Sequence, residues 1–497
     1  MYTFIFSLVL LIIGYLTYGK YVEKVFGADP SRPTPAISQP DGVDFVPLGS
    51  FRALFIQFLN VVGTGPIFGA IAGALFGPMA FVWIVLGCVF GGAVHDFFSG
   101  MLSVRSKGAT IGELVGENLG EFARHGMRLF SVVLLVLTGV VFLTSPADIL
   151  FNLTGGAISR NMLLIIIISY YIFATLLPVD KLIAKIYPLF GMALFFMAVG
   201  ISVSLIVGNI KGIYYTPEIT HLATKINWNT THTLFPFLFI SIACGAISGF
   251  HATQSPIIGR CIKSEKDGRK VFYLAMIGEG IVATVWAAAA MTLFPLAGEG
   301  LGLASQLEGL RAAGSAPVVV NSVASLTLGK LGAGLAVLGV VAAPITSGDT
   351  SFRGARLIIA DVFKISQQPI RNRLFIAIPL FAVGAILSQV DFNIIWRYFA
   401  WSNQTLATIG LWSSTAWLLK RNKNYLITLL PALFMTMVTV TYIVIAPEGF
   451  VRFFKDAGQD TILMGGLLIA SIVAISALVK FIMTKREYDK NNLYIED

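Results

Sequence analysis

The residues of this 497-residue chain that could do chemistry are the polar and ionisable ones inside long apolar stretches. At the bilayer centre each would cost on the order of 3 kcal/mol unless it is paired or faces water, so such residues indicate function. Because histidine titrates near neutral pH, His95, beside Asp96, and His251 are candidates for a proton relay. The alternative for both histidines is a structural role, in which a hydrogen-bonded histidine packs one helix against another. Glu279 is a further ionisable residue inside an apolar span.

A second polar run, 346–351, lies in a later apolar stretch and has the spacing of a helical ion pair. Arg353 follows Asp349 by four residues, an order and spacing that favour pairing on a helix. The pair could be purely structural, or the hydroxyls of the run could complete a sodium site. The candidates for coupling or gating are His95, Asp96, Thr346, Ser347, Asp349, Arg353, Asn403 and Gln404.

Several kinds of catalytic chemistry are excluded by spacing. Cys88, Cys244 and Cys261 form no CxxC pair, and the five histidines form no HExxH pattern, so no metal site or disulfide scaffold is expected. The run 14–20 reads G-x-x-x-x-G-K, but a tyrosine replaces the Ser/Thr that would hold magnesium. No catalytic dyad or triad is recognisable, so we expect no enzyme and no cofactor beyond a coupling proton or sodium ion.

Two apolar segments, 51–76 and 233–258, are interrupted near their centres by residues that break helices. Unwound backbone offers carbonyls to cations, and half-helix N-termini can face a carboxylate. Glycines that only permit close helix packing are the alternative. The expected substrate-binding residues are Gly63, Thr64, Gly65, Pro66, Phe68, Gly245, Ser248, His251 and Gln254.

The composition makes lipid the solvent for most of the chain. Hydrophobic residues make up 56% and charged residues 12%, whereas soluble domains carry about 25% charged residues. A soluble globular enzyme is therefore excluded, and about thirteen transmembrane helices are predicted. The predicted spans are 1–17, 51–76, 79–103, 127–150, 161–178, 186–208, 233–258, 271–294, 329–366, 373–390, 394–418, 425–446 and 462–484.

The positive charges give the orientation. With the N-terminus outside, most of the 35 lysines and arginines fall in cytoplasmic segments, as the positive-inside rule expects. The net charge of +9 is thus a topology signal, and no basic patch with interleaved aromatics suggests nucleic acid. Arg353, Arg356 and Arg397 fall inside predicted spans. The C-terminus is predicted to be cytoplasmic.

Four spans separate the two interrupted segments, so a repeat of five spans would enter the membrane a second time upside down, as in secondary transporters. Residues 51–208 are predicted to form the first five-helix repeat and 233–418 the second, inverted one. Residues 1–50 would add an N-terminal span and a cytoplasmic loop. Residues 425–497 would add two accessory spans and a cytoplasmic tail.

The motif-bearing stretches resemble the carbon starvation protein A family of bacterial membrane transporters. The matching stretches are TPA with DGVDFVP (34–47), VVGTGPIFG (61–69), GGAVHDFFSGMLSVRSKGATIGELVGENLG (91–120), SGFHATQSP (248–256), APITSGDTSFRGARLIIAD (343–361) and WRYFAWSNQTLA (396–407). The resemblance extends to the amino acid–polyamine–organocation superfamily. It implies an all-α, LeuT-like fold, a five-plus-five inverted repeat with discontinuous first and sixth core helices.

The resemblance also implies uptake of small nutrients when preferred carbon is scarce. Peptides and pyruvate are the substrates associated with family members, the latter with proton coupling, and both carry a carboxylate. We expect a secondary active peptide transporter in the bacterial plasma membrane, driven by an ion gradient, with protons as the first candidate. A pyruvate/proton symporter is the alternative, and a channel or nutrient sensor on a transporter scaffold is the alternative of another class. The oligomeric state stays open.

Overall fold

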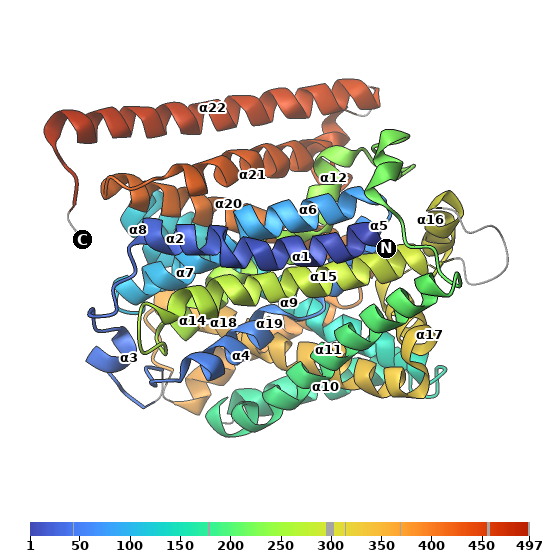
Figure 1. The fold of residues 1–497 in the computed structure, drawn as a ribbon. Coiled ribbons are helices and arrows are strands. Elements are labelled where there is room, and N and C mark those ends of the chain that lie inside the picture. The colour runs from blue at the N-terminus through green and yellow to red at the C-terminus, as the bar shows by residue number, and fades with distance from the viewer. Residues whose placement is uncertain are drawn as a thin grey trace.

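The computed structural model describes residues 1–42, 44–176, 179–294, 303–313, 315–367, 369–454 and 458–495, which fold into a bundle of helices (Figure 1). Within this part of the chain, nine helices are long and apolar enough to cross a membrane, and two helix pairs pass the same test as bent spans. No strand forms among these residues apart from one isolated bridge between Leu48 and Ile262. The prediction of an all-α polytopic membrane protein is confirmed.

The first half of the bundle contains the first broken helix. Its helices are α1 (Tyr2–Leu16), α2 (Tyr18–Phe26), α3 (Pro35–Ser38), α4 (Ser50–Val61), α5 (Gly65–Ala74), α6 (Met79–Gly87), α7 (Ala93–Arg105), α8 (Ile111–Leu119), α9 (Glu121–Leu153), α10 (Arg160–Leu176) and α11 (Val179–Ile210). Helices α6 and α7 form one span because a π-helical turn, η1 (Cys88–Gly92), joins them. Such turns are rare and often lie at functional sites, and this one directly precedes His95 and Asp96.

The second half contains the second broken helix and ends with two long helices that pack on each other. Its helices are α12 (Leu234–Ser241), α13 (Ala243–Ala246), α14 (Phe250–Gly259), α15 (Leu274–Thr292), α16 (Leu303–Ala312), α17 (Ala316–Ala336), α18 (Ala343–Val362), α19 (Ile370–Leu387), α20 (Phe392–Lys420), α21 (Leu426–Ile445) and α22 (Gln459–Asn491). Two further π-helical turns, η3 (Arg269–Tyr273) and η4 (Val337–Ala342), precede α15 and α18.

In the described residues, every predicted span lies on a helix or on a broken helix, but several helices, among them α2, α3, α8 and α16, form outside the predicted spans. Helix α16 and the first part of α17 occupy a region that the sequence assigned to an outer loop, and they meet at a bend of 120°. Charged residues such as Glu308 and Arg311 interrupt the apolar pattern there, so the region does not stand out as a span. The helical backbone breaks again at Gly329, where φ is +56°. Gly329 is the first residue of the span predicted for 329–366.

The two ends of the chain lie at opposite ends of the bundle. Helix α1 begins at the right-hand end in Figure 1, where α16 also lies, whereas α22 ends at the left-hand end. This arrangement agrees with an odd number of crossings. Which end faces the cytoplasm stays a prediction from the charges.

Candidate functional site

The first broken helix consists of α4 and α5, which meet at an angle of 51°. Val62 leaves the helical conformation, and α5 starts at Gly65 with Pro66 in its first turn, as predicted. Proline suits this position because the first-turn N–H groups have no partner within the helix. The Thr64 hydroxyl is buried and has no hydrogen-bond partner among the described residues. The break therefore leaves the Thr64 hydroxyl free in the core of the bundle.

The second broken helix consists of α12, α13 and α14, and α20 supports its unwound backbone. Asn403 Oδ1 accepts hydrogen bonds from the Phe250 N–H (2.7 Å) and from the Ser248 hydroxyl (3.3 Å). Gln404 Nε2 donates to the Ala243 carbonyl at 3.2 Å. Asn403 and Gln404, which the sequence suggested as a polar wall or gate, thus hold the break in place. Unpaired buried backbone groups would otherwise be costly.

The two breaks contact each other directly. A Cβ atom added to Gly65 would lie 2.5 Å from Cys244 Sγ, and one added to Gly69 would lie 3.0 Å from the Ser241 carbonyl oxygen. Gly245 faces Ala283 of α15 in the same way, at 2.3 Å. The structure thus brings the two broken helices together at Gly65 and Gly69 of the first and Ser241 and Cys244 of the second, with glycine making the close approach possible. Gln254, further along α14, donates to the hydroxyl of its neighbour Thr253.

Four ionisable side chains beside the second break form a fully buried group, here called the buried cluster: His95, Asp96, His251 and Glu279. His251 Nδ1 lies 2.7 Å from Asp96 Oδ2, and His251 Nε2 lies 3.2 Å from Glu279 Oε2. His95 Nδ1 lies 3.0 Å from Asp96 Oδ1. The buried cluster therefore joins α7 to α14 and α15, that is, the first half of the bundle to the second.

The predicted ion pair on α18 is present. Arg353 Nη2 donates to Asp349 Oδ2 at 2.8 Å and to the Ala174 carbonyl of α10 at 3.3 Å. Asp349 is 2% exposed, so the pair keeps a carboxylate neutralised inside the bundle. This geometry fits the structural role that the sequence left open for the pair.

Two hydroxyls of the run on α18 bond within their own helix. The hydroxyls of Thr350 and Ser351 both donate to the Ser347 carbonyl of their own helix. Added Cβ atoms on Gly63 and on Gly348 would both contact Phe142, so this ring stands between the break and the run. The side chain of Thr346 lies outside the described residues.

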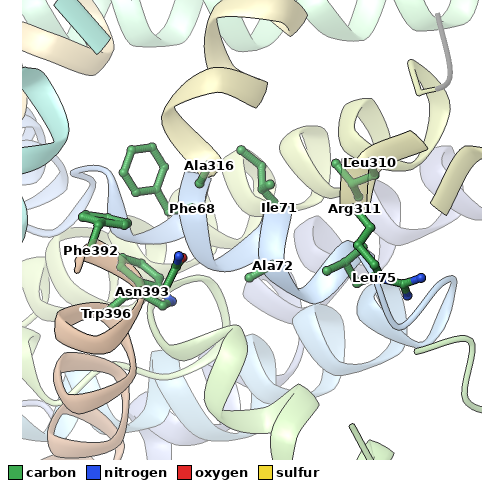
Figure 2. Close-up of a pocket in the computed structure, with 10 residues that line it drawn as sticks. All are labelled: Phe68, Ile71, Ala72, Leu75, Leu310, Arg311, Ala316, Phe392, Asn393 and Trp396. Carbon is green, nitrogen blue, oxygen red and sulfur yellow. The ribbon is translucent and has the colours of Figure 1, made fainter. Parts of the chain in front are cut away.

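A pocket of about 230 Å³ is lined by residues of α5, α16, α17 and the start of α20, and α16 lies at the end of the bundle where the chain begins (Figure 1). Figure 2 shows aromatic side chains and Asn393 at one end of it and the Arg311 guanidinium at the other. The lining residues are Phe68, Ile71, Ala72, Leu75, Leu310, Arg311, Ala316, Phe392, Asn393 and Trp396. Phe68 is the predicted site residue that reaches this pocket.

The sequence missed some residues of the site for identifiable reasons. Glu279 stood out as a carboxylate in an apolar span, but nothing in its own helix indicated His251 as its neighbour. Arg311 was counted as a charge of an outer loop, whereas α16 places it on the pocket. Gln57, which donates to the Ser255 hydroxyl at 3.0 Å and is fully buried, gave a signal as a polar residue inside an apolar stretch.

The chain matches the protein family described as carbon starvation protein CstA over residues 1–159, 147–332 and 309–442. An uncharacterised membrane protein of Haemophilus influenzae is 42% identical over 57% of this chain and 88% of its own length. The peptide transporter CstA of Bacillus subtilis is 27% identical over 95% of each chain. The pyruvate/proton symporter BtsT of Escherichia coli is 27% identical over 58% of this chain and 48% of its own length.

The fold is similar to that of solved transporter structures. A manganese transporter of Eremococcus coleocola aligns with a TM-score of 0.54 over 91% of this chain and 99% of its own, at 15% sequence identity. At this identity the likeness concerns the fold alone. It agrees with the predicted LeuT-like core with two discontinuous helices.

Proposed function

Because this chain belongs to the carbon starvation protein CstA family, we propose that it is a secondary active transporter that takes up small peptides, driven by a proton gradient. It would act as a multi-pass protein of the bacterial plasma membrane and not as an enzyme. The observation that carries the proposal is the direct contact of two broken helices in the core, Gly65 against Cys244, in a chain whose relatives are named transporters. The repeats would be residues 51–208 and 233–418.

We assign a carboxylate-bearing substrate to the pocket beside α5. Arg311 is the charged residue among those that line it, and a guanidinium binds a carboxylate with paired hydrogen bonds. At the other end Phe392 and Trp396 offer apolar area for side chains, and Asn393 offers an amide. A dipeptide has a carboxylate and side chains that could use both ends, whereas pyruvate could use only the Arg311 end. From the pocket a substrate would reach the breaks past Phe68.

A ligand-binding measurement tests the substrate class. A ligand that binds the folded state raises its stability by mass action, by about 2.7 kcal/mol at one hundred times Kd. We expect alanyl-alanine to raise the thermal unfolding temperature of the purified protein, and Arg311→Ala to weaken that effect. Pyruvate and acetate are measured in parallel, with and without sodium.

The outcomes separate the candidates. A larger shift with pyruvate than with alanyl-alanine would favour the pyruvate/proton symporter, which the similarity to BtsT supports. A shift in unfolding temperature that requires sodium would indicate that sodium, and not the proton, is the coupling ion. If neither peptides nor pyruvate shift the unfolding temperature, the proposed substrate classes are wrong.

A further inference from the structure

The charge balance of the buried cluster requires a bound proton. Both ring nitrogens of His251 lie close to a carboxylate oxygen: Nδ1 is hydrogen-bonded to Asp96 Oδ2, and Nε2 lies 3.2 Å from Glu279 Oε2 without forming a hydrogen bond. A neutral imidazole has one N–H and one lone pair, and the lone pair would repel the carboxylate that it faces. Either His251 is doubly protonated or one of the two carboxyl groups is protonated. In both cases the cluster holds at least one proton beyond those of neutral histidines and two carboxylates.

No basic side chain in the described residues offsets this charge. The ionisable groups nearest to the cluster are the thiols of Cys88, which contacts Gly280, and of Cys244. Two of the other helices that pack on α14 present neutral amides to it, Gln57 from α4 and Asn403 from α20, and α9 presents the Phe142 ring to Phe250. Two carboxylates with only one imidazolium between them would leave a buried negative charge, which is strongly unfavourable. The protons of the cluster are therefore the means by which it is neutralised.

The cluster is mechanically linked to the second break. His251 is the second residue of α14, and α14 begins where Asn403 accepts the Phe250 N–H. Asp96 belongs to α7 and Glu279 to α15, so His251 ties the half-helix to both neighbours. Removing the proton from between His251 and its carboxylates would turn attraction into repulsion at this joint. The protonation state thus acts on the half-helix next to the proposed substrate site.

We infer that His251, shared between Asp96 and Glu279, holds the coupling proton. Binding and release of this proton shift α14 against α7 and α15. This inference rests on the proposed transport function and names its ion site. His95 acts as a positioning residue, because it binds the Asp96 oxygen that His251 does not use. Glu279 is the proton's second partner.

A distance measurement without substrate tests the movement. Spin labels on L129C and I257C, both exposed positions on α9 and α14, are compared in a C261S background at acidic and alkaline pH. We expect the distance distribution to shift with pH in the intact cluster and to become independent of pH in Glu279→Gln and Asp96→Asn. The matched control is Asp148→Asn, which removes a carboxylate that pairs with Arg160 outside the cluster and should respond like wild type.

The outcomes are decisive even if a cluster variant does not fold. An intact cluster whose distance distribution is the same at all pH values overturns the inference, and so does a pH response of Glu279→Gln equal to that of wild type. In proteoliposomes, Glu279→Gln should lose accumulation of alanyl-alanine driven by a proton gradient but retain exchange of internal for external alanyl-alanine. If wild type shows the pH-dependent movement but no proton-driven uptake, the proposed function fails and the ion site stands.

Discussion

At the scale of single residues, Asn403 explains why polar side chains occur inside this bundle. Its amide oxygen accepts the Phe250 N–H, which as the first N–H of α14 has no partner within the helix, and the hydroxyl of Ser248 in the unwound segment. The sequence identified Asn403 as a polar residue of a late span. It could not identify its partner, which lies 153 residues earlier in the chain, because helix packing alone brings the two together.

Replacing Asn403 by alanine should therefore destabilise the fold. A buried donor left without a partner costs about 1–3 kcal/mol, and two donors lose their acceptor here. We expect Asn403→Ala to lower the thermal unfolding temperature in detergent, whereas Asn491→Ala, at an exposed position at the end of α22, should leave it nearly unchanged. Equal effects of the two substitutions would contradict the role given to Asn403.

At the scale of elements, glycine allows the two halves to approach at the breaks. Gly92, where η1 meets α7, lies against the second break, because an added Cβ atom would be 2.3 Å from the Ala246 carbonyl oxygen. This neighbour is backbone and cannot rotate away as a side chain could. Because Gly92 has no side chain, the start of α7 can lie directly against the backbone of the second break.

A methyl group at this position should separate the elements. Overpacking a closely packed site costs about 1–3 kcal/mol, so Gly92→Ala should lower the unfolding temperature and reduce transport. Gly465→Ala is the matched control, because nothing lies within 4 Å of its added Cβ atom on α22. A Gly92→Ala protein with the stability and activity of wild type would show that the close approach is dispensable.

The broken helices were predictable from sequence, whereas their contacts were not. Gly63 and Pro66 interrupt an apolar stretch, and this local signal located the first break correctly. The pairing of His251 with Glu279 and the position of Arg311 on the pocket depend on how α14, α15 and α16 pack. Packing between distant segments leaves no periodic trace in either segment. The outer helix α16 was missed because it is short and partly charged.

At the scale of the whole molecule, the bundle has two distinct ends, and the charges predict which of them lies outside. The chain starts at one end of the bundle, and α22 ends at the other (Figure 1). The pocket lies at the starting end, beside α16. If that end is outside, as the positive-inside rule predicts, the pocket faces the nutrient supply.

Accessibility of introduced cysteines would establish this orientation. Thr224, in the loop before α12, and Lys263, between α14 and η3, are both exposed but lie in loops predicted on opposite sides. In a C261S background, a membrane-impermeant maleimide should label T224C in intact cells and label K263C only after the membrane is opened. The reverse pattern would invert the topology and place the pocket in the cytoplasm.

The central claim is that substrate moves uphill at the expense of a proton gradient, and uptake by purified protein in liposomes tests it most directly. We predict that an imposed gradient, acidic outside, drives saturable accumulation of alanyl-alanine above its external concentration, and that a protonophore abolishes this accumulation. Passive flux that neither saturates nor responds to the gradient would contradict the account and indicate a channel built on the same scaffold.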